Sequence, residues 1–179
     1  KLHALMRVFD GRIVKIHAHR ADDIMTAIRI SIEFGLNATI DHATEAYLIP
    51  DKIKESNVKC IIGPTLGSAS KYELVNKSFT SGRVLEEHGI DFAIMTDHPV
   101  ITLDVTLVQA ALFIKEGLSP LKALEALTIA GARLNGIEDR VGSLEINKDA
   151  DIVIWDGPIF DIMTRPQMVM INGEVVHQK

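Results

Sequence analysis

Short apolar runs alternate with longer amphipathic stretches over the first three quarters of the chain. The runs are too short for buried helices and predict strands at 13–16, 36–41, 58–63 and 90–96. Between them, apolar residues such as Ile24, Ala27 and Ile28 recur three or four positions apart, which is typical of helices. The predicted helices span 22–34, 50–56, 82–88, 103–115 and 120–131.

Capping residues mark several of the expected helix ends. Asp22 is the expected N-cap of the first helix, and Ser119 followed by Pro120 is a typical helix start. Gly35 is expected to end the first helix, because glycine is common just after the last helical residue. The polar segment 64–81 lacks such a pattern, and a loop of this length inside a domain is usually functional or mobile.

Strand and helix alternate four times, which predicts a parallel sheet covered by helices. In a (β/α) barrel, chemistry takes place at the carboxyl ends of the strands. His17, His42 and Asp97 each stand at such an end, and Thr65 takes the corresponding place on the third strand. His19 lies two residues after His17, so both imidazoles point to the same side of the sheet.

From about Asn135 the pattern changes to alternating apolar and polar residues separated by turn residues. Strands are predicted near 151–155, 168–171 and 174–177, and Asn172-Gly173 is a strong hairpin signal. We therefore divide the chain into a (β/α) part, residues 1–134, and a small β element, residues 135–179.

Composition narrows the class of protein. Hydrophobic residues make up 47% and aromatic residues only 5%, so the core is built from aliphatic side chains, which suits buried parallel strands. A net charge of −5 argues against a nucleic-acid or anionic membrane partner. No apolar run approaches the roughly 20 residues of a membrane span, and no signal peptide is recognisable, so we expect a cytoplasmic protein. The single cysteine, Cys60, lies in an apolar run and is expected to be buried and inert.

The residues at the strand ends suit a metal site. Imidazole nitrogen and carboxylate oxygen are the usual ligands of a hydrolytic divalent ion such as zinc. Such an ion lowers the pKa of bound water from about 15.7 to about 7, and an aspartate beside it can move the proton to a leaving nitrogen. Each residue alone has an ordinary explanation: a lone histidine is usually a surface or core residue, and an aspartate after a strand often caps the next helix. The joint pattern favours a metal.

Five segments carry a more specific signal, and they are HAHRADDI, IDHATEAYL, GPTLGSASKYELVNKSF, TDHPV and GARLNGIEDRVGSLEINKDADIVIWDG. Together and in this order they resemble the metal-dependent amidohydrolase superfamily, and within it the imidazolonepropionase-like branch. The resemblance implies an α/β fold: a partial TIM-type (β/α) barrel, strands five to eight with their helices, plus the C-terminal strands of a small β-sandwich.

The resemblance also implies roles for single residues. His17 would be the metal ligand on the fifth barrel strand, His42 the ligand or hydrogen-bond donor on the sixth, and Asp97 a metal ligand and proton shuttle on the eighth. His19 would contact the substrate beside the metal. We expect a divalent metal ion, with zinc preferred and iron or manganese as alternatives. Thr65 and His98 are further candidate substrate contacts, although loop polarity explains Thr65 and packing explains His98 equally well.

Three basic residues and one turn are weaker signals. Arg20, Lys71 and Arg83 are candidates for holding an anionic substrate group, but a solvated surface explains them better. The family's usual turn has Pro-Gly where Ile146-Asn147 stand here, and asparagine still tolerates a left-handed conformation.

Two superfamily features have no counterpart in this sequence: the His-x-His of the first barrel strand and the bridging lysine of the fourth. The chain therefore resembles the C-terminal half of an enzyme that hydrolyses non-peptide C–N bonds, such as those of a cyclic amide or imide, in a small molecule. The alternative is a catalytically silent half-barrel that self-associates or pairs with an N-terminal half. A metal-free carbohydrate or phosphate binder is a weaker reading, since no glycine-rich phosphate cradle supports it.

A half-barrel also leaves strand edges unpaired, and such edges seek partners. We therefore expect a homo-oligomer, with the strand after Gly11 or the strand around Phe92 at the contact. For the isolated chain we expect weak metal binding and negligible hydrolase activity.

Overall fold

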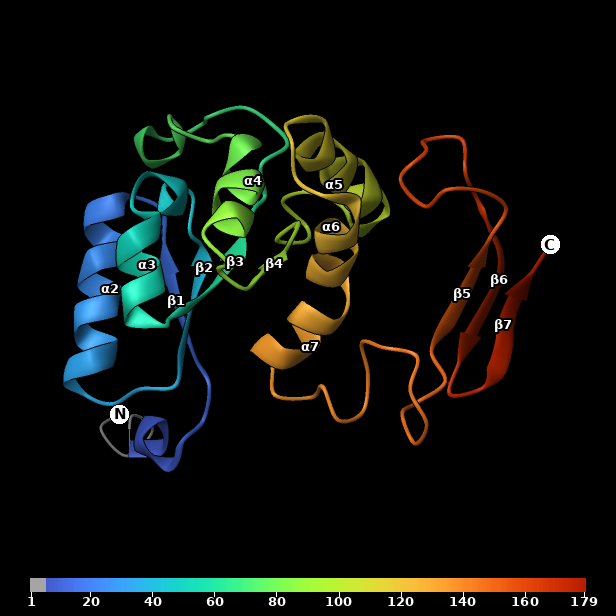
Figure 1. Cartoon of the computed structure of the whole chain (residues 1–179), viewed down its shortest axis with the longest axis horizontal. Helices are drawn as coiled ribbons and strands as arrows, with labels where there is room; N and C mark the ends of the chain where they lie inside the picture. Colours follow the sequence, from blue (N-terminus) through green and yellow to red (C-terminus); the bar gives the residue numbers. More distant parts are fainter. Residues whose placement is uncertain (1–5) are drawn as a thin grey trace.

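Four short strands form a parallel sheet in the order β1-β2-β3-β4 (Figure 1). The structure is a computed structural model that describes residues 6–179. The strands span Val14–Ala18, Ala38–His42, Lys59–Ile62 and Phe92–Ile94. Because strands that follow one another in sequence are also neighbours in the sheet, each connection is a βαβ crossover. The predicted parallel α/β arrangement is confirmed.

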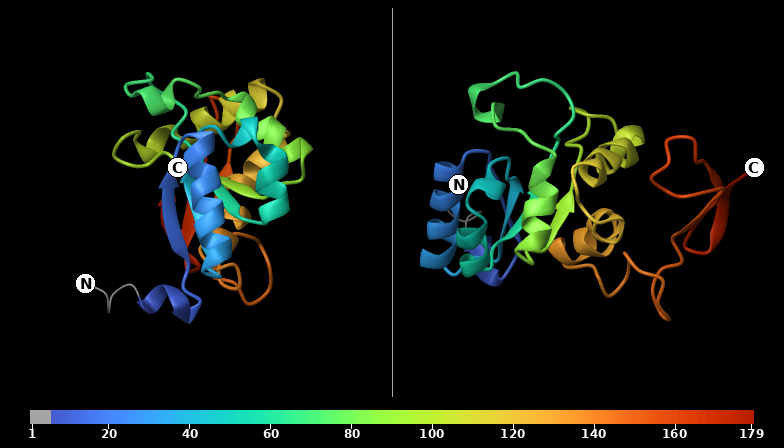
Figure 2. Two further views of the ribbon diagram at one scale, coloured as in Figure 1. Left: turned by 90° about the vertical axis from the view of Figure 1, so that its left-hand side faces the viewer. Right: turned by 45° about the horizontal axis from the view of Figure 1, so that its top comes forward.

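The connections between the strands are helical. The α-helices are α2 (Ala21–Glu33), α3 (Pro50–Ser56), α4 (Thr80–Glu87), α5 (Thr106–Lys115), α6 (Pro120–Leu127) and α7 (Ile129–Leu134). Short 3-10 turns stand before β1 and in the segments that lead to α3, α4 and α5: η1 (Met6–Asp10), η2 (Ala46–Leu48), η3 (Tyr72–Leu74) and η4 (Leu103–Val105). The loop 64–81 thus contains η3 and the start of α4. Figure 2 shows it standing out from the strand ends as the green segment.

The core lies mainly on one face of the parallel sheet. Ile40, Cys60 and Ile62 pack there with residues of α2 to α6. Side chains alternate across a strand, so Ile61 points the other way, and it packs in a second, smaller cluster with residues of α7. Helices therefore cover both faces of β3 and β4, which explains why these strands are nearly all apolar.

Two features of the helices differ in kind from the sequence-based prediction. The first helix begins at Ala21, so Asp22 lies in its first turn and is not the N-cap. The Ala21 N–H instead donates to Glu45 Oε2 at 2.7 Å, a carboxylate supplied from beyond β2. The helix predicted over 120–131 is divided at Thr128, whose ψ of −99° is not helical.

Other predicted boundaries lie close to the observed ones. α4 begins at Thr80, two residues before its predicted start, and α5 begins at Thr106, three residues after its predicted start. The helix over 50–56 matches α3, and the Ser119 side chain accepts a hydrogen bond from the Lys122 N–H at the start of α6, as a capping serine should.

The C-terminal segment forms a separate antiparallel sheet of β5 (Ile152–Trp155), β6 (Pro166–Ile171) and β7 (Glu174–Gln178). Asn172 and Gly173 both have positive φ, 51° and 81°, as the tight hairpin turn predicted there requires. Every residue of these strands is at least partly exposed. The sheet lies at the opposite end of the molecule from β1, beyond α5 to α7 (Figure 1).

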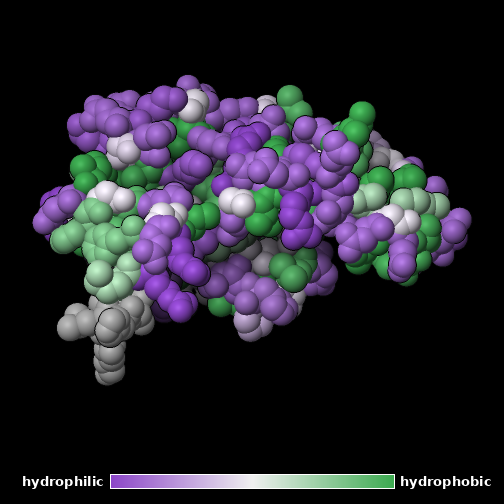
Figure 3. Space-filling view, turned by 90° about the horizontal axis from the view of Figure 1, so that it is seen from below, coloured by the Kyte–Doolittle hydropathy of each residue, from purple (hydrophilic) through white to green (hydrophobic). Residues whose placement is uncertain are grey.

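The surface seen from below is mixed, with hydrophilic residues over most of it and hydrophobic ones scattered between them (Figure 3). Over residues 6–179, the structure contains no helix that combines the length and the apolar character needed to cross a membrane.

Candidate metal centre

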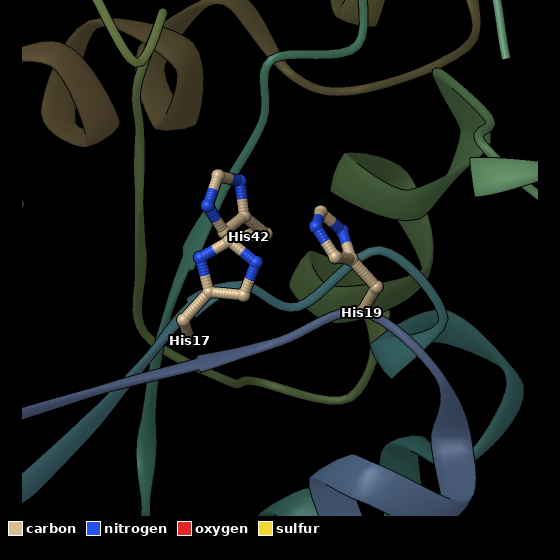
Figure 4. A group of neighbouring side chains, drawn as sticks. All are labelled: His17, His19 and His42. Atoms are coloured by element: carbon tan, nitrogen blue, oxygen red, sulfur yellow. The ribbon is translucent and has the colours of Figure 1, made fainter. Parts of the chain in front are cut away.

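Three histidines gather at the carboxyl ends of β1 and β2 (Figure 4). His17 lies on β1, His19 follows that strand directly, and His42 ends β2. One ligand atom from each lies within 4.8 Å of the others. The ring centroids of His17 and His42 are 4.1 Å apart, and those of His19 and His42 are 4.5 Å apart. The parallel register causes this convergence, because it sets Ala18, the residue between His17 and His19, opposite His42.

The His42 ring is oriented by the neighbouring strand. Its Nδ1 lies 2.8 Å from the carbonyl oxygen of Gly63, just after β3. A carbonyl oxygen only accepts, so Nδ1 carries the proton and the lone pair of Nε2 is left for another partner. A metal-binding histidine commonly shows this pattern, with one nitrogen fixed by the protein and the other one free to coordinate.

His19 is held in a comparable way. It is buried, and its Nδ1 lies 2.8 Å from Thr44 Oγ1. Its Nε2 lies 3.7 Å from a carboxylate oxygen of Glu73, which η3 contributes from the long loop. The loop 64–81 therefore reaches across the strand ends and meets the histidine cluster.

The cluster keeps two of its imidazoles uncharged at neutral pH. Burial, followed by the proximity of His42 and His17, lowers the pKa of His19 from 6.5 to about 4. Burial likewise lowers the pKa of His42, although the bond to the Gly63 carbonyl and the nearby Asp97 work in the opposite direction. Only a neutral imidazole has a lone pair to give, so the low pKa values favour metal binding.

Asp97 lies beyond β4, in an exposed turn, with a positive φ of 53°. Within residues 6–179, the metal-capable donors that the structure groups together are the three histidines, and Asp97 is not part of that group. Its carboxylate is nevertheless close enough to His42 to favour the protonated form of that ring. The structure thus brings His17 and His42 together, and sets Asp97 at the neighbouring edge of the site.

The predicted substrate contacts fall into three different settings. His19 belongs to the histidine cluster itself. Thr65 lines both a cavity of about 10 Å³ beside His42, roughly the size of one water molecule, and a larger hollow of about 400 Å³ under the long loop. His98 is exposed in the same turn as Asp97.

The basic residues considered for an anionic substrate are paired with carboxylates. These pairs are Arg20 Nε with Asp22 at 3.0 Å, Lys71 Nζ with Glu73 at 3.5 Å and Arg83 Nη1 with Glu87 at 2.7 Å. This pairing supports the solvated-surface interpretation.

Cys60 is fully buried, and burial raises the pKa of its thiol to about 12. Such a thiol is inert at neutral pH, as the sequence predicts.

Several residues that shape the site carry no recognisable signal of their own in the sequence. Thr44 and the carbonyl of Gly63 orient two of the rings. Glu45 holds the start of α2 through Ala21 and also accepts from Asn76 Nδ2 at 2.8 Å, so it ties the long loop to the strand ends. The one available hint was that Thr44 and Glu45 lie two and three residues after His42, at the end of the same strand.

Comparison with known proteins places these features in a family. The family model described as "Amidohydrolase family" matches residues 3–176. The crystal structure of an amidohydrolase from Thermotoga maritima MSB8 is 40% identical, superposes with a TM-score of 0.95 and matches 99% of this chain, which covers 47% of that one. An imidazolonepropionase from Pseudomonas aeruginosa is 39% identical over 82% of this chain and 36% of its own length.

A more distant structure shows the fold alone. A Xaa-Pro dipeptidase with bound methionine in its active site is 23% identical, with a TM-score of 0.71 over 97% of this chain and 46% of the dipeptidase. The chain thus spans less than half the length of each of these three proteins. The family match over nearly the whole sequence, together with the parallel sheet and the histidines at its strand ends, shows that this chain belongs to the amidohydrolase family.

Proposed function

We propose that this chain supplies barrel strands five to eight, β1 to β4 here, of a metal-dependent hydrolase that cleaves a non-peptide C–N bond in a small molecule. Residues 1–134 would form the barrel part and residues 135–179 the C-terminal strands of a small sandwich. The observation that carries the proposal is the three-histidine cluster at the carboxyl ends of adjacent parallel strands.

The donors fit a divalent transition metal. They are imidazole nitrogens, their low pKa values keep His19 and His42 neutral, and Gly63 and Thr44 fix two of the rings. His17 and His42, with Asp97, would hold the ion; zinc suits such nitrogen and carboxylate ligands, with iron or manganese as alternatives. When bound, the ion would polarise the scissile carbonyl and lower the pKa of water.

The remaining steps belong to the chain's own side chains. Asp97 accepts the proton of the attacking water on a carboxylate oxygen and delivers it to the leaving nitrogen, which its exposed position in the turn allows. His19, neutral and fixed through Nδ1, offers Nε2 to the substrate. Thr65 and His98 contact the substrate from the neighbouring strand ends.

The imidazolonepropionase likeness supports a cyclic amide or imide as the bond that is cleaved. At 39% identity it is a far closer likeness than that of the Xaa-Pro dipeptidase, which is 23% identical and supports only the shared fold. A peptide substrate is therefore the less favoured choice.

A second role is supported by the edges of the sheet. β1 and β4 each have a single neighbour in this sheet, so each leaves one row of backbone groups without a strand beside it. As the alternative, we propose that the chain is a catalytically silent half-barrel that pairs at these edges with an N-terminal half or with a second copy of itself. Light scattering tests this, because a monodisperse monomer of the isolated chain would contradict self-association.

The proposed chemistry is tested by metal analysis and turnover in the complete enzyme. The purified enzyme should contain a stoichiometric divalent metal and hydrolyse members of a panel of cyclic amides and imides, and chelation should abolish both. A matched panel of dipeptides serves as the comparison. Turnover that survives complete removal of the metal, or that is confined to the dipeptides, would contradict the proposal.

A further inference from the structure

Gln109 is a fully buried polar side chain in the middle of α5 that none of the predicted roles uses. Most of the side chains buried with it in this part of the protein are apolar, among them Ala110 and Phe113 of the same helix. A buried polar group is costly unless its hydrogen bonds are satisfied, so its partners show what it does.

The amide oxygen of Gln109 serves the loop after β3. Oε1 accepts from the Thr65 N–H at 2.9 Å and lies 3.4 Å from the Leu66 nitrogen. These backbone groups directly follow Gly63-Pro64, and the Gly63 carbonyl is the one that orients the His42 ring. One half of the amide is therefore attached to the segment that fixes His42.

The amide nitrogen of Gln109 serves the segment after β4. Nε2 donates to the Met95 carbonyl at 2.9 Å, two residues before Asp97. The two segments touch here, because a Cβ placed on Gly63 would lie 2.2 Å from that same Met95 oxygen. Gln109 thus bridges the backbones that lead to His42 and to Asp97.

The bridge requires a side chain of this length that both accepts and donates. A carboxylate would accept from the Thr65 N–H but would repel the Met95 carbonyl, and an apolar residue would leave both backbone groups unsatisfied. Asparagine is one methylene shorter. Glutamine suits this position because it can accept from the Thr65 N–H and donate to the Met95 carbonyl at the same time.

We propose that Gln109 is a positioning residue that sets the Asp97 turn relative to the Gly63–His42 end of the site. It touches neither substrate nor metal and acts through the two backbone segments. The proposal rests on the proposed function only in that His42 and Asp97 serve one site. It predicts that loss of the bridge releases both segments together and disturbs metal binding.

The test compares Gln109→Met with Phe113→Leu, a variant of a buried residue in the same helix that packs against Phe79 and makes neither bridge contact. Amide hydrogen exchange is measured in the metal-free protein at Thr65 and Leu66, and at Val100 and Ile101, whose N–H groups close the Asp97 turn onto Asp97 and Thr96. Gln109→Met should accelerate exchange at both pairs by about tenfold or more. Phe113→Leu, at a similar loss of melting temperature, should leave both pairs protected.

Co²⁺ binding to the complete enzyme provides the second measurement, because the visible spectrum of Co²⁺ reports ligand geometry. Gln109→Met should weaken Co²⁺ binding by about 10–100-fold, the usual effect of removing a group that orients metal ligands, and should change the spectrum. Phe113→Leu should change neither. Faster exchange at Thr65 and Leu66 alone would overturn the bridge, and an unchanged Co²⁺ affinity and spectrum would reduce Gln109 to a structural brace and overturn the positioning role.

Failure of the proposed function is distinguishable from failure of this proposal. If the unaltered complete enzyme binds no Co²⁺, the proposed function is wrong, and the exchange pattern alone decides for or against the bridge. Should Gln109→Met fail to fold, Gln109→Glu replaces it, because a protonated carboxyl can both accept and donate as the amide does. Both segments should be protected while that carboxyl is protonated and should open together as rising pH ionises it; protection that does not depend on pH would overturn the proposal.

Discussion

The carboxyl ends of β1 and β2, which carry the histidines, are built differently from the turn after β4, which carries Asp97. His19 and His42 are buried, and each has one ring nitrogen fixed by a hydrogen bond within the protein. Asp97 is exposed, in a turn with positive φ. Ligands gain from being fixed before the ion arrives, whereas a group that moves a proton must be reachable by water and substrate. The difference therefore matches a division of roles in which His42 only holds the metal, whereas Asp97 holds it and also transfers the proton. His17, the other proposed ligand, is exposed as Asp97 is.

The largest expected effect is on the aspartate side. Asp97→Asn keeps the shape of the side chain but removes the base, so kcat of the complete enzyme should fall by about 10²–10⁴-fold. Metal content, measured by elemental analysis, should fall far less. Unchanged turnover would show that Asp97 serves only its turn and would end the proposed division of roles.

On the histidine side, the effect should appear in metal affinity. His42→Ala removes a proposed ligand, so Zn²⁺ affinity measured by calorimetry should drop by more than the roughly 10–100-fold typical of outer partners. His88→Ala, an exposed histidine of the α4 end bonded to the Val84 carbonyl, is the matched control and should bind Zn²⁺ as the unaltered protein does. Equal affinities in the two variants would contradict the site.

The same burial predicts acid sensitivity of the metal-free protein. The pKa of His19 falls from 6.5 to about 4 on folding, so the unfolded chain takes up the proton first and stability falls as pH drops between these values. The loss from His19 is at most roughly 3 kcal/mol, and the lowered pKa of His42 adds to it in the same direction. Urea unfolding from pH 7 to pH 4 measures it, and His19→Gln should flatten the curve. A midpoint that does not change with pH in either protein would contradict neutral, buried rings.

The smallest effect concerns the hydroxyl that fixes His19. Thr44→Val removes the partner of His19 Nδ1 and should lower the free energy of unfolding by about 1 kcal/mol, the usual size of one such bond. Thr44→Ser keeps the hydroxyl and should retain most of that stability. A loss in Thr44→Ser but none in Thr44→Val would assign the effect to packing of the methyl group and contradict a role for the hydroxyl.

Much of the fold follows from local patterns in the sequence. Strands β1 to β4 and helix α3 form where short apolar runs or helical spacing are bounded by turn residues, which are local features of the sequence. The hairpin at Asn172-Gly173 forms because both residues accept the positive φ that its tight turn needs. The break at Thr128 was missed because apolar spacing continues through it into α7. Asp22 was wrongly taken as a cap because Glu45, remote in sequence, satisfies the Ala21 N–H instead.

The candidate site was predictable only in outline. Parallel strand ends meet at one edge, so the convergence of His17 and His42 follows from alternation alone. The partners that orient them do not, because the Gly63 carbonyl and the Gln109 amide act through tertiary contacts between residues 14 to 44 positions apart in sequence. A single glutamine among the apolar residues of a helix indicates a buried polar contact but does not identify its partners.

We propose that His17 and His42, with Asp97 beside them, form a metal centre. Crystals of the complete enzyme soaked in Zn²⁺ and measured on both sides of the zinc absorption edge test it directly. We expect one dominant anomalous peak about 2.0–2.1 Å from a ring nitrogen of His17 and of His42, and about 2.0–2.2 Å from an Asp97 oxygen. A peak that lies elsewhere, or one that lacks both His17 and His42 as ligands, would contradict it.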